Sequence, residues 1–220
     1  MAKWTPSRLI AETERILTGG IGWPSFIESH EKIIRRLASH NWFTQPETPV
    51  SVIEDIEDCG EDIDRLNAIL TESTESLLDE IRSRLVLEYP ERKAIVLEIF
   101  ALHYEERFLA SIPLALATAE GIARKETNRS IFNVWRKRPE IAAWIDDSAA
   151  PKYGRPFLAA LIESHPMAQP RRGYLNRHEV LHGRQIDYGN EKFSLQAISL
   201  LGFVGWAFSS EDGLISGQGS

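Results

Sequence analysis

The stretch IVLEIFALHYEERFLASIPLALATAEG, residues 95–121, decides the fold class. Its apolar residues recur three and four positions apart, which is the spacing of a helix that buries one face. These residues are Ile95, Val96, Ile99, Phe100, Phe108, Leu109, Ile112, Leu114, Leu116 and Ala119. Pro90 is expected to open this helical segment, and Pro113 to kink it, because proline cannot donate a hydrogen bond inside a helix.

The helical spacing continues toward the N-terminus. A first helix is expected to begin at Thr5-Pro6 and to stop at Gly19-Gly20, and a second to run from about Trp23-Pro24 to Asn41. Turn-forming residues at 44–49 mark a boundary. The acidic, helical pattern at 52–88 then predicts two helices or one broken helix.

Toward the C-terminus, prolines set off two short helices, at about 141–145 and 157–162, before a last apolar helix from about Glu191 to Phe208. Alternating, strand-like segments are almost absent. The sequence therefore predicts an all-α helical bundle with an N-terminal helical extension. We expect a helical region at 1–88, a bundle at 89–210 and a frayed tail at 211–220.

Composition excludes several classes of protein. With 220 residues, 43% of them hydrophobic and 26% charged, the chain can bury a core of its own. Its net charge of −7 argues against a surface that binds nucleic acid indiscriminately. Basic residues are nevertheless concentrated between 152 and 184, at Lys152, Arg155, Arg171, Arg172, Arg177 and Arg184. A local site for a phosphate-bearing ligand is compatible with this pattern.

We expect a cytoplasmic protein that does not enter a membrane. The single cysteine, Cys59, has no partner for an internal disulfide, and the first residues lack the pattern of a secretion signal. The longest apolar run, about Leu195 to Phe208, is interrupted by Ser199 and two glycines and is shorter than the roughly 20 residues of a spanning helix.

Residues suited to chemistry gather between Tyr174 and Gly183. Asn176, Arg177, His178, Glu179 and His182 lie here, flanked by Arg171, Arg172 and Arg184. A histidine transfers protons near neutral pH, and an arginine is a permanent cation whose donors fit phosphate oxygens. Such a pair suits cleavage of RNA by its own 2′-hydroxyl, without a metal.

Geometry limits what one helix does with these residues. At about 100° per residue, His178 and His182 share a face, whereas Arg177 and His182 are about 140° apart. Two such helices meeting across a two-fold axis would bring an arginine and a histidine from each chain together.

The segment NRHEVLHG, residues 176–183, resembles the Arg-x4-6-His signature of the HEPN superfamily. Residues 193–208 look like that family's closing helix, and residues 103–122 resemble the long first core helix of abortive-infection and RNA-associated HEPN proteins. The resemblance covers about Glu91 to Phe208. Some toxins of the superfamily have a regulatory tyrosine two positions after the motif histidine, where this chain has Arg184.

The resemblance implies a metal-independent endoribonuclease that works as a homodimer in phage defence or as a toxin, with an antitoxin or inhibitor protein as a further partner. It implies that Arg177 and His182 are catalytic and that Asn176, His178 and Glu120 support them. Arg171, Arg172 and Arg184 are expected to bind the RNA, and no cofactor or metal is expected.

Two alternatives remain open. One is a HEPN scaffold that binds RNA or a nucleotide without cleaving it. The other is a zinc hydrolase, because His178, Glu179 and His182 spell the HisGluxxHis pattern of zinc proteases. Gly183 follows at once and no histidine lies farther along the chain, so a third ligand would have to be Asp187 or Glu191.

Overall fold

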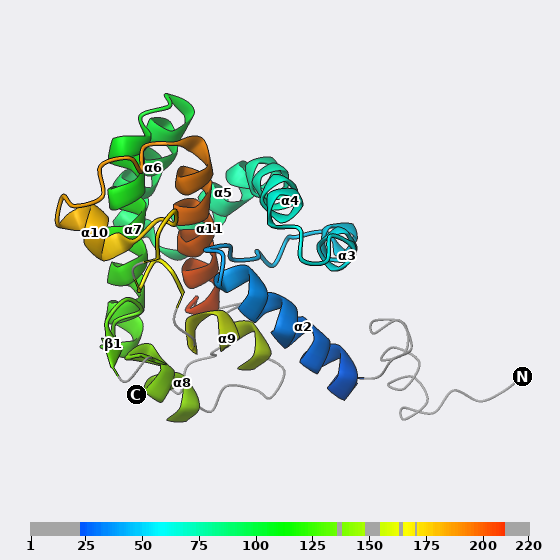
Figure 1. Ribbon diagram of the computed structural model, residues 1–220. Coiled ribbons are helices and arrows are strands. Elements are labelled where there is room, and N and C mark those ends of the chain that lie inside the picture. The colour runs from blue at the N-terminus through cyan, green and yellow to red at the C-terminus, as the bar shows by residue number, and fades with distance from the viewer. Residues whose placement is uncertain (1–22, 136–137, 148–154, 163–164, 170, 210–220) are drawn as a thin grey trace, which may run out of the picture.

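A computed structural model describes residues 23–135, 138–147, 155–162, 165–169 and 171–209 (Figure 1). Nearly all of its regular structure is helical, which confirms the predicted all-α fold. The helix expected after Thr5 and the tail expected at 211–220 lie outside the described residues.

The helices follow one another along the chain, with a single two-stranded hairpin among the described residues. The elements are α2 (Trp23–Ala38), α3 (Val50–Asp58), α4 (Ile63–Ser76), α5 (Leu78–Glu88), η1 (Pro90–Arg92), α6 (Lys93–Tyr104), α7 (Phe108–Thr127), β1 (Val134–Trp135), β2 (Arg138–Pro139), α8 (Ile141–Asp147), α9 (Arg155–Ile162), α10 (Arg177–Leu181) and α11 (Glu191–Ala207).

Helices α7 and α11 run side by side through the centre of the molecule (Figure 1). Helix α11 is buried on nearly every side, from Phe193 to Gly205, as its apolar sequence predicted. Two of its backbone carbonyls accept hydrogen bonds from residues in the first part of the chain: Gln45 Nε2 donates to Ser199 O at 2.9 Å, and Tyr89 Oη donates to Gly205 O at 2.8 Å. Residues on both sides of the predicted boundary at 88 therefore share one core.

Residues 95–121, which the sequence predicted to form one kinked helix, belong to two helices, α6 and α7. The chain turns between α6 and α7 at Glu106, which adopts a positive φ of 58°. Helix α7 continues through Pro113 and past Gly121 to Thr127. Because Pro113 has no N–H, the carbonyl of Leu109 lacks its usual helical donor, and Tyr188 Oη donates to it at 3.0 Å. This bond ties the segment before α11 to α7.

The acidic region is also more divided than the sequence predicted. It forms three helices, α3, α4 and α5, instead of two or one. The first break follows Cys59, at Gly60, whose φ of +52° favours glycine. The second break is at Leu77, which has a non-helical conformation and lies between α4 and α5. Asp62 caps α4 by accepting a hydrogen bond from Arg65 N at 3.0 Å.

The two short helices expected in the Pro-rich region are present as α8 and α9, and α9 packs on α2. None of the described helices combines the length and the apolar character that crossing a bilayer requires.

Candidate functional site

Helix α10 carries the sequence motif at the edge of the molecule, beside α7 (Figure 1). Asn176 starts the helix: its Oδ1 accepts from Glu179 N at 3.0 Å, and its Nδ2 donates to Pro166 O at 2.7 Å. The helix ends after one turn at His182, and Gly183 follows with a φ of +68°. The amides of Arg184 and Gln185 then donate to Glu179 O, at 2.7 and 3.0 Å. Asn176, predicted as a supporting residue, is 1% exposed and acts here as a helix cap.

Arg177 points from α10 toward the interior. Its guanidinium carbon lies 5.6 Å from the centre of the Phe132 ring, a cation–π distance. Its buried Nε has no hydrogen-bond partner in the described part of the chain. Val180, on the adjoining face, is buried, whereas Arg177 as a whole residue is half-buried. Arg177 therefore lies on the inward edge of the helix, as the angle of about 140° from His182 requires.

The two histidines of α10 form a stacked pair on its outward side. The ring centres of His178 and His182 are 5.6 Å apart and the rings are inclined by only 8°. His182 is exposed and His178 is half-buried. This pair follows from the i, i+4 spacing, which the sequence predicted.

A cleft of about 580 Å³ is lined in part by Glu179, which lies between these histidines in the chain. We call it the arginine cleft. It is lined by Arg171, Arg172, Gly173, Tyr174, Asn176, Glu179, Arg184, Gln185, Asp187, Asn190 and Phe193. All three arginines predicted to bind substrate line it, whereas Arg177, His178 and His182 do not. The structure thus brings the predicted binding residues together, and it separates them from Arg177.

Tyr174 orders one side of the arginine cleft. The guanidinium carbon of Arg171 lies 4.4 Å from the centre of the Tyr174 ring, and Tyr174 Oη bonds His40 Nδ1 at 2.9 Å. Burial, followed by the positive charges of Arg171 and Arg36, lowers the pKa of His40. Sequence reasoning missed Tyr174, although an aromatic residue next to paired arginines is a signal for stacking.

The charges in the arginine cleft are partly neutralised. Arg184 binds Glu179 through two hydrogen bonds, from Nε to Oε2 at 2.9 Å and from Nη2 to Oε1 at 2.7 Å. This contact lowers the pKa of the Glu179 carboxyl, and the nearby His182 and His178 lower it further. Two arginines, Arg171 and Arg172, then face one remaining carboxylate, Asp187. The cleft has a modest positive balance within an acidic protein.

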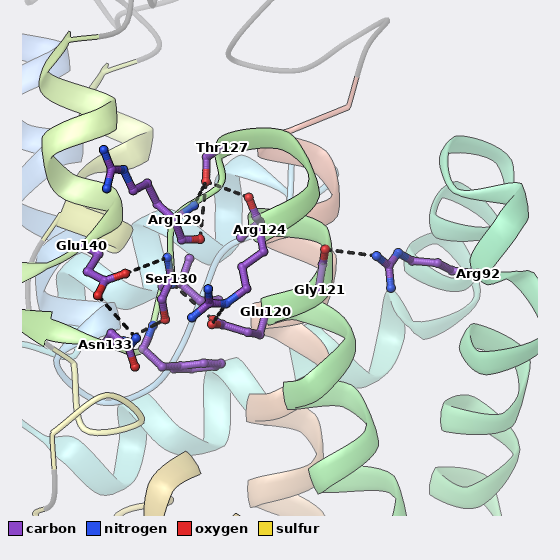
Figure 2. Close-up of polar contacts among 12 residues, drawn as sticks. Arg92, Glu120, Gly121, Arg124, Thr127, Arg129, Ser130, Asn133 and Glu140 are labelled. Carbon is purple, nitrogen blue, oxygen red and sulfur yellow. Dashed lines mark hydrogen bonds and ion pairs between the residues drawn. The ribbon is translucent and has the colours of Figure 1, made fainter.

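Glu120 holds the loop after α7 (Figure 2) and does not line the arginine cleft. Its Oε1 accepts from Arg124 Nε at 2.6 Å and its Oε2 from the amide of Ile131 at 3.3 Å. Ser130 Oγ accepts from the amides of Phe132 and Asn133, at 3.1 and 2.9 Å, so the loop is tightly bonded. Glu120 therefore approaches the motif through the loop that carries Phe132, the ring beneath Arg177.

Among the residues that the structure describes, no three side chains of His, Cys, Asp or Glu are grouped to hold a metal ion. A zinc site on His178 and His182 thus lacks a third ligand there, and Glu179, the general base of that alternative, is bound to Arg184. The arrangement suits binding of an anion and proton transfer by histidine.

No protein-family model, no curated protein and no solved structure matches this chain.

Proposed function

We propose that this protein binds RNA in the arginine cleft and cleaves it without a metal, with His182 and Arg177 as the catalytic pair. The observation that carries the proposal is the stacked His178–His182 pair on the outward side of α10, the helix whose Glu179 lines a cleft together with three arginines. Proton-transfer groups and phosphate-binding groups thereby lie on neighbouring surfaces of one small segment.

The chemistry requires a base for the 2′-hydroxyl and an acid for the leaving 5′-oxygen. His182 is exposed and reachable by a substrate, and its ring centre is 5.6 Å from that of His178. His182 would accept the proton of the 2′-hydroxyl, and His178 would return a proton to the leaving oxygen. Arg171 and Arg172 would hold the neighbouring phosphates, and Tyr174 offers a face on which a base stacks.

Arg177 enters this reaction only if a second surface completes the site. It lies about 140° around α10 from His182 and packs on Phe132. Within one protomer, Arg177 and His182 are therefore kept apart. A homodimer, in which α10 of one protomer faces α10 of its partner, would supply an arginine across the axis once the partner's Arg177 turns away from its own Phe132. The exposed apolar side chains of Leu181 and Ile186, 41% and 81% exposed, flank this surface and support such a contact.

The proposal is tested by incubating single-stranded and structured RNA with the purified protein in excess EDTA. Cleavage is expected for the wild type, and a loss of about 100-fold or more for His182→Ala, because general acid–base catalysis contributes that much. Arg177→Ala should lose activity in the same range. Normal cleavage by both folded variants would overturn the assignment, and cleavage that only zinc restores would favour the metal-site alternative.

A second candidate function is binding without turnover, as a scaffold for RNA or a nucleotide. It is favoured by one observation: the arginine cleft is complete within one chain and does not include Arg177 or His182. The Arg171→Ala/Arg172→Ala variant would then lose RNA affinity, while His182→Ala would bind as the wild type does. Arg65→Ala/Arg129→Ala, which removes two exposed arginines elsewhere, is the matched control for charge.

The biological setting is proposed from the HEPN resemblance alone. It would be a cytoplasmic toxin or phage-defence ribonuclease held in check by an antitoxin or inhibitor protein. Growth arrest on expression of the wild type, but not of His182→Ala, is the expected result.

A further inference from the structure

A second cleft, of about 460 Å³, lies where α4 meets α5 and where α6 ends. We call it the acidic cleft. It is lined by Glu75, Ser76, Leu78, Asp79, Glu80, His103, Tyr104, Glu106, Phe108 and Glu191. It shares no lining residue with the arginine cleft, and the function proposed above does not use it.

The acidic cleft is strongly negative. Five of its lining residues are carboxylates, and none is a lysine or an arginine. Asp79 is paired with Arg82 at 3.1 Å and accepts from Tyr104 Oη at 3.1 Å. The other four, Glu75, Glu80, Glu106 and Glu191, make no ion pair within the described part of the chain. Unpaired carboxylates around one hollow attract a cation.

The floor of the acidic cleft is aromatic. The ring centre of His103 is 5.8 Å from that of Tyr104 and 5.6 Å from that of Phe108. The faces of tyrosine and phenylalanine rings attract cations, and their carbon surface accepts methylene groups. Aromatic rings combined with carboxylates favour an organic cation over a bare metal ion, for which no suitable group of ligands exists among the described residues.

His103 adds a hydrogen-bond acceptor. It is only 6% exposed, and its Nδ1 bonds Ser194 Oγ at 2.9 Å. Ser111 donates to Ile99 O at 3.2 Å, and its hydroxyl lies 3.3 Å from that of Ser194. His103 Nε2 has no hydrogen-bond partner in the described residues, and it accepts a hydrogen bond when the ring carries its proton on Nδ1. Burial lowers the pKa of His103 more than the nearby Glu75 raises it, which favours the neutral ring.

We propose that the acidic cleft binds an alkylammonium cation, whose N–H groups bond the carboxylates and His103 Nε2 while its methylenes lie on Tyr104 and Phe108. Several unpaired carboxylates around one floor fit a ligand with more than one ammonium group. A free polyamine and a lysine side chain of another protein present this same chemistry.

The experiment is calorimetric titration of the full chain with spermidine at low ionic strength. One saturable site is expected, with Kd at least about tenfold weaker in Glu75→Gln/Glu106→Gln, which removes two exposed and unpaired charges. Tyr104→Leu should weaken binding about threefold through loss of the ring. Glu54→Gln/Asp58→Asn, on α3, removes two exposed carboxylates outside the cleft and should leave Kd unchanged.

If the α3 control weakens spermidine binding as much as the cleft variant does, the effect is diffuse attraction of counter-ions, and the proposal is overturned. Displacement of spermidine by Mg²⁺ at the same concentration of charge would overturn it in the same way. Absence of saturable binding would also overturn it. A second titration, with Nα-acetyl-lysine amide, distinguishes the sources: tighter binding of spermidine indicates a free polyamine, and tighter binding of the lysine derivative indicates a protein partner.

Discussion

Asn41 and Asn176 contact the two polar backbone groups of Met167, its N–H and its carbonyl oxygen. Asn41 Oδ1 accepts from Met167 N at 2.9 Å, and Asn176 Nδ2 lies 3.4 Å from Met167 O. Asn41 also donates to Leu175 O at 3.0 Å. Both asparagines are buried, at 0% and 1% exposed. Asn41, in the turn that follows α2, thereby fixes the segment that leads into α10, and this gives the N-terminal part of the chain a role at the candidate site.

The first prediction concerns Asn176. Replacing it with alanine removes the cap of α10 and leaves Pro166 O buried without its donor, so the free energy of unfolding should fall by about 2–3 kcal/mol. Asn190→Ala is the matched control, because Asn190 caps α11 only through Phe193 N and should cost about 1 kcal/mol. Urea denaturation compares them, and an equal loss in both variants would contradict a special role for Asn176.

The second prediction separates the two histidines of α10. Because His182 is exposed and His178 half-buried, His182→Ala and His178→Ala should each change the free energy of unfolding by no more than about 0.5 kcal/mol. If the pair transfers protons, each variant should lose RNA cleavage by about 100-fold or more, and the double variant should lose little beyond that. A fully additive loss in the double variant would indicate two independent roles.

The third prediction concerns Glu120, which the sequence named as a supporting residue. Glu120→Gln keeps an acceptor for the Ile131 amide and removes the ion pair with Arg124, so the unfolding free energy should fall by about 1 kcal/mol. The pH dependence of any RNA cleavage should stay as in the wild type, because the hydrogen bonds of Glu120 go to α7 and to the loop after it. A displaced pH profile would instead assign Glu120 a part in proton transfer.

The sequence predicted the helical class and the last helix, because the apolar spacing around Ile99 and the apolar run of α11 leave little choice of structure. It did not predict the break at Glu106, since nothing in the local pattern demands a positive φ at a glutamate. It predicted that His178 and His182 share a face. It could not predict that Arg177 packs on Phe132, because that contact joins segments far apart in the chain.

The fourth prediction concerns pH and His165. This ring is 1% exposed, lies edge-on to Phe43 at 5.4 Å, and has no hydrogen bond among the described residues. Burial lowers its pKa to about 4. The unfolded chain, with a histidine pKa of about 6.5, then binds more protons, so stability is full above that pH and is lost as pH falls toward 4.

Between pH 7 and pH 5 this histidine should account for about 2 kcal/mol of lost stability. His165→Phe keeps a ring against Phe43 and removes the titrating group. In this variant the free energy of unfolding should therefore fall by about 2 kcal/mol less between pH 7 and pH 5 than it does in the wild type. Urea melts at the two pH values measure it. The same acid sensitivity in the variant would mean that other groups, such as His103 and His40, cause it.

The fifth prediction compares two glycines inside helices. A Cβ at Gly202 of α11 would lie 2.7 Å from Ile81 Cγ2 and would collide with Gln45 Oε1. Gln45 cannot move aside without losing its bonds to Phe43 O and Ser199 O, both 2.9 Å long. Gly202→Ala should therefore lower the free energy of unfolding by about 1–3 kcal/mol, as overpacking of a filled core does.

Gly121 of α7 is the matched case. A Cβ there would meet Arg92 Nη1 at 3.0 Å, and that atom is the end of a flexible side chain. Arg92 can shift by a few tenths of an ångström, at some cost to its bond with Gly121 O at 3.0 Å (Figure 2). Alanine is favoured over glycine inside a helix by up to about 1 kcal/mol, so Gly121→Ala should be neutral or stabilising. In paired urea melts Gly202→Ala should destabilise the protein and Gly121→Ala should not, because Arg92 beside Gly121 can move and the neighbours of Gly202 cannot. Destabilisation of both by the same amount would contradict that account.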